Sequence, residues 1–347
     1  MKSRHSKIKV LFVSNGIGKG GKERQIHEIL SHLNDHQEFE CALLLRKPEV
    51  AYTIEQLDNI RFFIPPHALN ANQFVRFLGE GCSSFRPDVI HTWESWVTNM
   101  SHIYRFTRLK KIKVIDGSLR YAKSFKKNGV PYWSARIGRI LSHRVIANSS
   151  AGLDSIDYAR QGKYSVVTNA MNAQRLHVPI QLEKTDKPFT ITMVASFTPA
   201  KDYATLITTV SEMLLEGYDI VCNLVGDGKM RTEMMELVPS NQRDRFHFTG
   251  LIADPERILN HSHVGVLLAR KGHSEGYSNT IMEIIAAGLP VICTNTGGNP
   301  EMVTPNKNGF LIGHESKEEL RSAIHALYTS PELCDQMGLA SRTFARC

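Results

Sequence analysis

The chain has 347 residues, 42% of them hydrophobic and 22% charged, a length and composition typical of a soluble globular protein with two domains. Residues 1–175 hold 27 Lys and Arg against 14 Asp and Glu, a net charge of +13, whereas residues 176–347 hold the remaining 15 against 20, a net charge of −5. No apolar stretch reaches the roughly 18–20 residues that span a bilayer, and the six scattered cysteines include no C-x-x-C pair, which argues against a disulfide framework or a structural zinc site and favours a cytoplasmic protein.

In the first half of the chain, short apolar runs alternate with longer amphipathic ones. The run at 9–14 is too short for a signal peptide and passes into a glycine-rich turn, so we interpret it as a buried strand. A helix is expected at 21–33, and further strands at 39–45, 87–93, 113–117 and 143–149. A helical stretch precedes each of the last three strands. This alternation predicts a doubly wound parallel sheet.

The alternation weakens at 173–188, which is polar and carries two prolines, and this stretch is the expected linker. Strands are then expected at 189–196, 219–226, 245–250, 263–269 and 289–294. Helices are expected at 202–215, 229–237, 278–287 and 317–328. The sequence therefore predicts two α/β domains of similar size, residues 1–175 and 176–347.

A glycine-rich turn follows the first expected strand. Gly16, Gly18 and Gly21 fit the G-x-G-x-x-G pattern of dinucleotide-binding enzymes. The next strand ends in Leu45-Arg46-Lys47 rather than in the acidic residue that holds the ribose of NAD, although an NADP enzyme could use Arg46. With or without a dinucleotide cofactor, this turn is expected to bind a phosphate near the N-terminus of the following helix.

The strongest signal is the segment 274–291, in which Glu275 and Glu283 lie eight residues apart. If a helix begins near Ser278, the N–H groups at 277–279 face a pyrophosphate. Glu283 then lies roughly 7 Å further along the helix axis, about the step from pyrophosphate to ribose, and can accept hydrogen bonds from the ribose hydroxyls. Glu275 lies on the other side of the phosphates, beside the sugar. One nucleotide sugar spans the motif.

This segment resembles family 4 of the retaining glycosyltransferases, the glycosyl transferases group 1, which have the two-domain fold called GT-B. The family pattern E-G-x-x-x-x-x-x-E-A-x-A-x-G-x-P-V is met at Glu275, Gly276, Glu283, Ala286, Gly288, Pro290 and Val291. Further family motifs are met at Gly20–Arg24, Val225–Gly228, Gly298–Val303 and Asn308–Leu311. The resemblance implies two Rossmann-like domains facing a cleft, the first binding the acceptor and the second binding the nucleotide sugar.

The resemblance also implies roles for single residues. It implies catalytic roles for Glu275 and Lys201. The residues expected to bind the donor are Gly20, Gly21, Ser196, Lys201, Gly226, Leu251, Tyr277, Ser278, Asn279 and Glu283. The residues expected on the acceptor side are Trp93, Glu94, Asp116 and Arg120.

The chain departs from the family at several positions. The family's phosphate clamp G-R-x-x-x-x-K keeps its lysine as Lys201, but its arginine is Ser196 here, so one cationic contact to the diphosphate is expected to be lost or supplied elsewhere. The N-G-V-D motif appears as Asn169–Asn172, and Asp116 stands where a histidine is often found. The chain ends at Cys347, where the family usually has a long helix that crosses back to the first domain.

The reaction implied is transfer of a hexose or N-acetylhexosamine from a nucleoside diphosphate, with retention, to a glycan or lipid-linked acceptor in polysaccharide, lipopolysaccharide or glycolipid synthesis. UDP is the expected carrier because uridine is the commonest base in the family. The chain contains no D-x-D motif, so neither an essential divalent metal nor a cofactor is expected. Double displacement with Glu275 as nucleophile and front-side attack both remain open. The alternatives are a GT-B-fold sugar-nucleotide epimerase and a non-catalytic protein that binds a sugar nucleotide or a lipid.

The basic residues of the first half are densest between 105 and 144. This stretch holds 12 Lys and Arg and one acid, Asp116, with Tyr121, Phe125, Tyr132 and Trp133 among them. One interpretation is a solvated basic face. The interpretation that we favour is a patch that docks on an anionic membrane, because aromatic residues with Lys and Arg suit the headgroup zone. It implies a peripheral protein at the inner face of the cell membrane, with no nucleic acid as partner.

Overall fold

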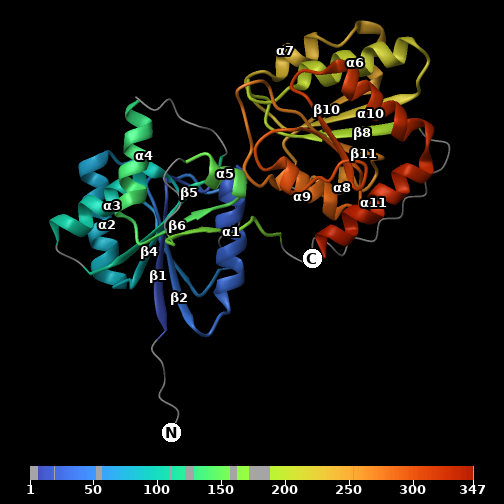
Figure 1. Cartoon of the computed structure of the whole chain (residues 1–347). Coiled ribbons are helices and arrows are strands. Elements are labelled where there is room, and N and C mark those ends of the chain that lie inside the picture. The colour runs from blue at the N-terminus through green and yellow to red at the C-terminus, as the bar shows by residue number, and fades with distance from the viewer. Residues whose placement is uncertain are drawn as a thin grey trace. The chain divides into compact units, whose positions relative to one another are not determined.

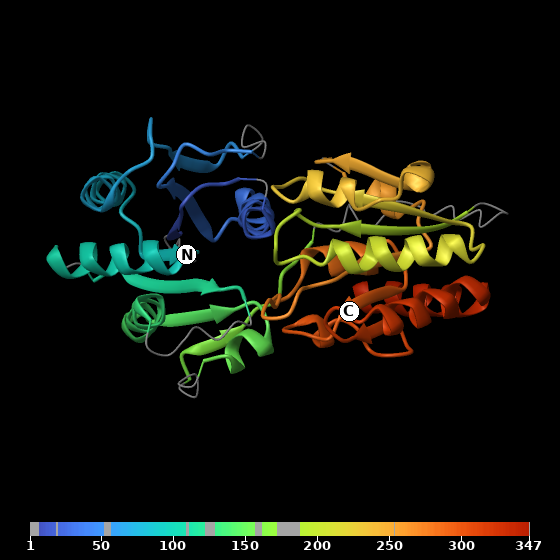
Figure 2. The same ribbon diagram turned by 90° about the horizontal axis from the view of Figure 1, so that it is seen from above.

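The computed structural model describes residues 7–18, 20–51, 57–108, 111–121, 129–156, 162–171, 188–252 and 254–346. The chain forms two compact units, residues 1–170 and 171–347. In each unit a parallel sheet carries helices on both faces, as the sequence predicts (Figures 1 and 2). The expected domain boundary after residue 175 falls within 172–187, outside the described residues.

The first unit is built on a sheet of seven parallel strands in the order β3-β2-β1-β4-β5-β6-β7. The strands are β1 (Ile8–Ser14), β2 (Phe39–Leu45), β3 (Ile60–Phe63), β4 (Val89–Thr92), β5 (Lys113–Leu119), β6 (Arg144–Ala147) and β7 (Tyr164–Val166). The helices are α1 (Gly21–Asn34), α2 (Ala71–Phe85), α3 (Ser95–Thr107), α4 (Val130–Leu141) and α5 (Ser150–Asp154). The sequence did not predict β3 and β7, because edge strands of four and three residues carry too little apolar pattern.

The strand β1 shows why the sheet is covered on both faces. Leu11 and Phe74 belong to the core between the sheet and the helices α2 and α3. Phe12, the next residue along β1, belongs to the opposite core with Ile26 and Leu30 of α1. Because successive side chains of a strand point to opposite faces, a strand between two cores is apolar at nearly every position.

The second unit is built on a sheet of six parallel strands in the order β10-β9-β8-β11-β12-β13. The strands are β8 (Phe189–Val194), β9 (Ile220–Val225), β10 (Phe246–Gly250), β11 (Val264–Leu267), β12 (Val291–Thr294) and β13 (Gly309–Ile312). The helices are α6 (Tyr203–Leu215), α7 (Arg231–Glu236), α8 (Glu256–Leu259), α9 (Asn279–Ala286), α10 (Lys317–Thr329) and α11 (Pro331–Ala345), with 3-10 turns η2 (Ser240–Arg245) and η3 (Asn299–Glu301). Figure 1 shows α6 and α10 on one face of this sheet and α9 on the other.

In each sheet the strand order reverses beside the first strand, since β1 lies between β2 and β4, and β8 lies between β9 and β11. The connections on the two sides of that strand run in opposite directions. In doubly wound sheets this arrangement leaves a crevice at the carboxyl ends of the strands. Doubly wound sheets bind ligands in this crevice, and most residues expected to be functional follow these strands. Among the described residues, no helix is both long enough and apolar enough to cross a membrane.

Candidate functional site

The loop after β8 holds Lys201 at the carboxyl edge of the second sheet. Phe197 stacks face to face on Tyr203, with ring centroids 3.9 Å apart. The Tyr203 hydroxyl donates a hydrogen bond to the carbonyl oxygen of Ala195 at 2.5 Å. Ser196 is exposed on this loop, so a hydroxyl stands at the position of the family's arginine.

A glycine turn after β9 supports the same loop from the side. Gly226 has a φ of +139°, and a Cβ at this position would collide with the carbonyl oxygen of Ala195. The N–H of Gly226 donates to the carbonyl oxygen of Gly250 at 2.9 Å and joins the ends of β9 and β10. Leu251 follows and is exposed at the same edge. Only glycine fits at 226, so the Val225-Gly226 motif positions the loop that carries Lys201.

Lys201 and Glu275 form an ion pair between the loops that follow β8 and β11, and their side chains are only 14% and 26% exposed. The N–H of Gly298 donates to the carbonyl oxygen of Glu275 at 3.0 Å. Gly297, with a φ of +56°, packs so closely that a Cβ would collide with the same carbonyl oxygen. The two residues expected to be catalytic are therefore brought together, and backbone contacts hold the glutamate in place.

The helix α9 begins beside the loop that carries Lys201. Ser278 caps the helix, because its side chain accepts a hydrogen bond from the N–H of Ile281 at 3.4 Å. The Thr280 hydroxyl donates to the carbonyl oxygen of Val194, the last residue of β8, at 3.0 Å. The first turn of α9, with the positive end of its dipole, therefore lies at the end of the strand from which the Lys201 loop starts.

Two other residues expected at the donor belong to this segment. Glu283 lies in the second turn of α9 and is 3% exposed, so a hydrogen bond to its carboxylate is shielded from bulk water. Burial, and then the charge of Glu301, raise the pKa of Tyr277, so its hydroxyl stays protonated at neutral pH. In the part of the chain that the structure describes, no three His, Cys, Asp or Glu side chains gather as a metal site.

At the first sheet, Glu94 joins the ends of β1 and β4. Its carboxylate accepts hydrogen bonds from the Ser14 hydroxyl at 3.0 Å and from the N–H of Asn15 at 3.2 Å. It also forms an ion pair with Lys22, which pairs with Glu23 at 3.0 Å. Burial alone would lower the pKa of Lys22, but the charges of Glu94 and Glu23 outweigh it and raise the pKa.

The glycine turn after β1 is the place where the sequence predicts a donor phosphate. Gly20 is the N-cap of α1, and the carboxylate of Glu23 lies so close to it that a Cβ on Gly20 would collide with an oxygen of Glu23. A phosphate at Gly20 and Gly21 would therefore compete with this carboxylate for the N-terminus of α1.

The residues expected on the acceptor side all lie near the carboxyl edge of the first sheet. Trp93 and Asp116 are buried at this edge, and the Arg120 guanidinium lies 4.0 Å from the centroid of the Trp93 ring. His91, which was not among the residues expected at the site, lies beside Trp93, with ring centroids 5.2 Å apart. Burial, and then the charge of Arg120, lower the pKa of His91 to about 3. The imidazole is therefore neutral at physiological pH.

Residues 176–344 match the family model "Glycosyl transferases group 1". The second unit therefore carries the domain of this family. The group 1 domain contains the Lys201–Glu275 pair, the Gly226 turn and α9, and the ion pair, the turn and the N-terminus of α9 lie at the carboxyl edge of the second sheet.

The chain is similar to the 2-deoxystreptamine N-acetyl-D-glucosaminyltransferase of Niallia circulans, with 22% identity over 217 residues that cover 58% of this chain and 54% of that protein. It is also similar to the GDP-mannose-dependent alpha-(1-6)-phosphatidylinositol monomannoside mannosyltransferase of Mycobacterium tuberculosis, with 28% identity over 160 residues that cover 44% and 42% of the two chains. The chain thus spans about half the length of the curated relatives it matches.

Among solved structures, Anabaena HepE in complex with UDP-glucose is similar over 97% of this chain and 94% of its own, with a TM-score of 0.79 and 18% identity. This likeness shows the fold, two Rossmann-like parallel-sheet units of the GT-B type. The expected fold class is confirmed.

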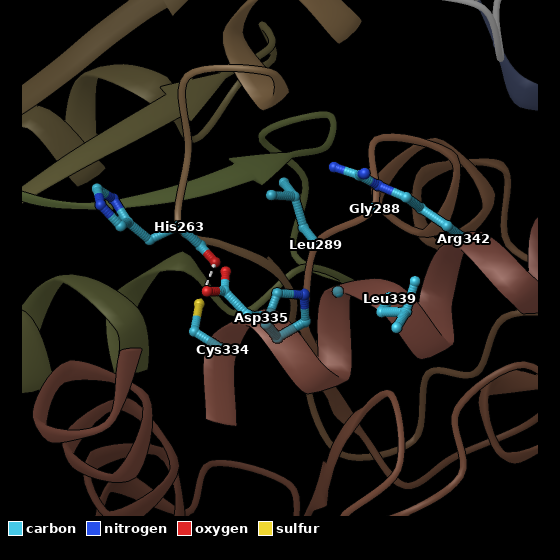
Figure 3. Close-up of a pocket in the computed structure, with 9 residues that line it drawn as sticks. His263, Gly288, Leu289, Cys334, Asp335, Leu339 and Arg342 are labelled. Atoms are coloured by element: carbon cyan, nitrogen blue, oxygen red, sulfur yellow. Dashed lines mark hydrogen bonds between the residues drawn. The ribbon is translucent and has the colours of Figure 1, made fainter. Parts of the chain in front are cut away.

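A separate hollow of about 290 Å³ lies in the group 1 domain (Figure 3). Its lining residues precede β11 and β12 or belong to α11, and are His263, Gly288, Leu289, Pro290, Cys334, Asp335, Gly338, Leu339 and Arg342. The Arg342 side chain lies across Gly288, where a Cβ would collide with it. Because amino and carboxyl ends of parallel strands lie at opposite edges, this hollow is distinct from the site of Lys201 and Glu275.

Proposed function

We propose that this group 1 glycosyltransferase moves a sugar from a nucleoside diphosphate to an acceptor hydroxyl with retention of configuration. The observation that carries the proposal is the Lys201–Glu275 ion pair near the N-terminus of α9, at the switch point of the second sheet. Negative charge builds on the diphosphate as its bond to the sugar breaks. Lys201 and the N–H groups of the first turn of α9 stabilise this charge.

Glu275 acts on the sugar. In a double displacement its carboxylate attacks the anomeric carbon as the diphosphate leaves and forms a glycosyl-enzyme intermediate. The acceptor hydroxyl then displaces the carboxylate, and its proton passes to the released diphosphate. In front-side attack the acceptor hydroxyl approaches on the face that the diphosphate leaves, its proton passes to the leaving phosphate, and Glu275 stabilises the positive charge on the sugar. In either mechanism the incoming diphosphate draws Lys201 away from Glu275. Donor binding therefore releases the carboxylate for catalysis.

The proposed donor is a UDP-hexose or UDP-N-acetylhexosamine, used without a divalent metal, with its ribose held by Glu283. HepE is named in complex with UDP-glucose, and the relative from Niallia circulans is named an N-acetylglucosaminyltransferase. The mycobacterial relative is named for GDP-mannose, so a test needs both bases. Lys201 and the dipole of α9 supply the positive potential that a metal ion supplies in other transferases.

The test is product analysis with the purified chain. UDP-glucose, UDP-N-acetylglucosamine and GDP-mannose are each incubated with a panel of glycan and lipid-linked acceptors, and the anomeric protons of the product are assigned by NMR. A product that keeps the anomeric configuration of the donor supports the proposal, and an inverted product contradicts retention. Epimerised nucleotide sugar without an acceptor product would favour the epimerase alternative, and donor binding without any product would favour the non-catalytic one.

The proposed acceptor is a glycan or lipid-linked hydroxyl at an anionic membrane, in the synthesis of a cell-surface polysaccharide or glycolipid. The outer face of α4 supports a membrane location. Val130, Trp133, Ile137 and Ile140 are 83%, 50%, 51% and 51% exposed, and their spacing places them along one stripe of the helix. The Arg136 guanidinium lies 5.3 Å from the centroid of the Trp133 ring. An apolar stripe flanked by cations suits the interface of an anionic leaflet.

This stripe adds an apolar contribution to the charge that the sequence predicted. Residues 109–110 and 122–128 of the basic stretch lie outside the described residues. The charge attraction decays with salt, since the Debye length is about 10 Å at 0.1 M and about 3 Å at 1 M. The apolar insertion of Trp133 and Ile137 into the bilayer is not screened by salt in this way. Binding to anionic vesicles should therefore fall with salt but not vanish at 1 M.

Vesicle co-sedimentation tests the membrane location, with phosphatidylcholine alone and with phosphatidylglycerol added. The double variant Trp133→Ser/Ile137→Ser should lose the salt-resistant part of the binding. The matched control is Leu215→Ser, because Leu215 is 74% exposed on α6 of the other unit. Wild-type binding by the double variant, or no binding to either vesicle, would reduce the stripe to an ordinary solvated face and favour a soluble acceptor.

A further inference from the structure

Neutral neighbours hold the Arg120 guanidinium in one orientation. Its Nε donates a hydrogen bond to the carbonyl oxygen of Gly117 at 2.9 Å, and its Nη1 donates to Oδ1 of Asn169 at 3.1 Å. The Trp93 ring covers one face of the guanidinium, 4.0 Å from its central carbon. Each of these contacts fixes the plane of the cation without neutralising its charge.

The support for Arg120 extends to α1 through Asn169. The next residue, Ala170, exchanges two hydrogen bonds with the side chain of Gln25, at 2.8 Å and 2.9 Å. This exchange anchors the segment that carries Asn169 to a helix of the same unit. The second terminal nitrogen of Arg120, Nη2, has no hydrogen-bond partner among the residues that the structure describes, and the side chain is only partly buried. One edge of the guanidinium is therefore open.

The positive charge of Arg120 is not compensated by an ion pair in the described part of the chain. Burial lowers the pKa of Arg120 to about 10, and the charge of Asp116 acts in the opposite direction. Asp116 makes no hydrogen bond to Arg120, because its Oδ1 accepts from the N–H of Ser118 at 2.8 Å and from the Thr98 hydroxyl at 3.4 Å, and its buried Oδ2 has no partner among the described residues. A fixed, partly buried guanidinium with an open edge is preorganised to bind an oxyanion.

We infer that Arg120 binds a carboxylate or phosphate group of the acceptor, so that this enzyme takes an anionic sugar rather than a neutral one. The inference rests on the proposed function. Arg120 and Trp93 lie at the carboxyl edge of the first sheet, where doubly wound sheets bind their ligands. The guanidinium fork matches the two oxygens of a carboxylate or phosphate. Loss of this charged contact should raise the KM for an anionic acceptor by about 10- to 150-fold.

The first experiment measures binding without catalysis. The Nε–H resonance of Arg120 is followed by NMR in the full chain labelled with 15N-arginine, and is assigned by its absence in Arg120→Gln. The probes are methyl glucuronide, methyl glucoside 6-phosphate and methyl glucoside, which differ at carbon 6 as carboxylate, phosphate and hydroxyl. UDP is present at saturation, so that the probes cannot occupy the diphosphate site. The resonance should move with one or both anionic probes and stay with the neutral one.

Arg46 provides an internal control in the same spectrum. Its Nε donates to the carbonyl oxygen of Leu69 at 2.9 Å, and its guanidinium lies 4.4 Å from the centroid of the Trp96 ring. It therefore shares the carbonyl contact and the aromatic contact of Arg120 but follows a different strand. Its resonance should not move with any probe. Arg120→Lys keeps the charge without the fork and should bind the anionic probes more weakly than the wild type but more strongly than Arg120→Gln.

The second experiment measures transfer to a matched anionic and neutral acceptor. Arg120→Gln should raise KM for the anionic acceptor only, and Arg46→Gln should change neither. Three results would overturn the inference. They are equal responses to all three probes, no response to any of them, or a shift that UDP causes and that the probes do not change. If the anionic probes bind through Arg120 but no donor and acceptor pair reacts, the anion site stands and the proposed transfer fails.

Discussion

Replacing Glu275 by Gln keeps the size of the side chain and removes the charge that pairs with Lys201. Opposite charges about 4 Å apart attract by about 4 kcal/mol at an effective dielectric constant of about 20. The two side chains are 14% and 26% exposed, and solvent screening with desolvation reduces the net value to about 1 kcal/mol. Released from this pair, Lys201 should bind the diphosphate about fivefold more tightly. Turnover should fall about 10²- to 10³-fold, because an electrostatic group at the sugar is lost.

Calorimetry with UDP gives the affinity, and initial rates of sugar transfer, or of donor hydrolysis without acceptor, give the turnover. The matched control is Glu212→Gln, which breaks the exposed Lys317–Glu212 ion pair of 2.8 Å on α6 and should leave both quantities unchanged. Weaker UDP binding with normal turnover would assign Glu275 to donor binding. Wild-type values for both would remove Glu275 from the site.

Glu283→Gln should weaken UDP binding by about 10- to 150-fold and leave turnover at saturation nearly unchanged, since the ribose loses a charged acceptor; equal affinities in calorimetry would contradict this. Transfer should persist in EDTA, and complete loss that Mg²⁺ or Mn²⁺ restores would show that a metal neutralises the diphosphate. Gly297→Ala should lower turnover and reduce the free energy of unfolding by about 1–3 kcal/mol, because its Cβ displaces the carbonyl of Glu275; urea unfolding and rates measure both, and a wild-type profile would show that the backbone contact is not needed. The pKa of His91 is about 3 in the folded chain and about 6.5 when unfolded, so the unfolded state binds more protons below pH 6.5. His91 should therefore lower the free energy of unfolding as the pH falls from 7 to 5, with a contribution of at most about 1.4 kcal/mol per pH unit, and a slope that stays the same in His91→Gln would count against this origin.

The sequence predicted the long buried strands best. The expected strand 39–45 coincides with β2 (Phe39–Leu45), because a strand covered on both faces is apolar at nearly every position and polar residues mark its ends. The four-residue β13 (Gly309–Ile312) was not predicted, since its apolar run is only the three residues Phe310–Ile312, between Gly309 and Gly313. Its place beside β12 depends on long-range pairing.

The candidate site was predicted as a set of residues but not as a geometry. Lys201 and Glu275 lie 74 residues apart, and the contact between Gly297 and the carbonyl of Glu275 that fixes them leaves no local pattern. The apolar spacing of Val130 and Trp133 on α4 is visible in the sequence, but periodicity alone does not say whether such a stripe faces a core or solvent. The exposure of these side chains comes from the structure alone.

The loop that carries Ser196 is held by groups other than the serine side chain. The carbonyl of Ala195 receives the Tyr203 hydroxyl, and the N–H of Phe197 donates to the carbonyl oxygen of Asp227 at 2.9 Å. Position 196 can therefore vary in side chain while the loop keeps its shape. Mutational tolerance next to the proposed diphosphate site would let natural selection or directed evolution change donor preference at little risk to folding. An arginine introduced at this position would add its charge to an unchanged scaffold.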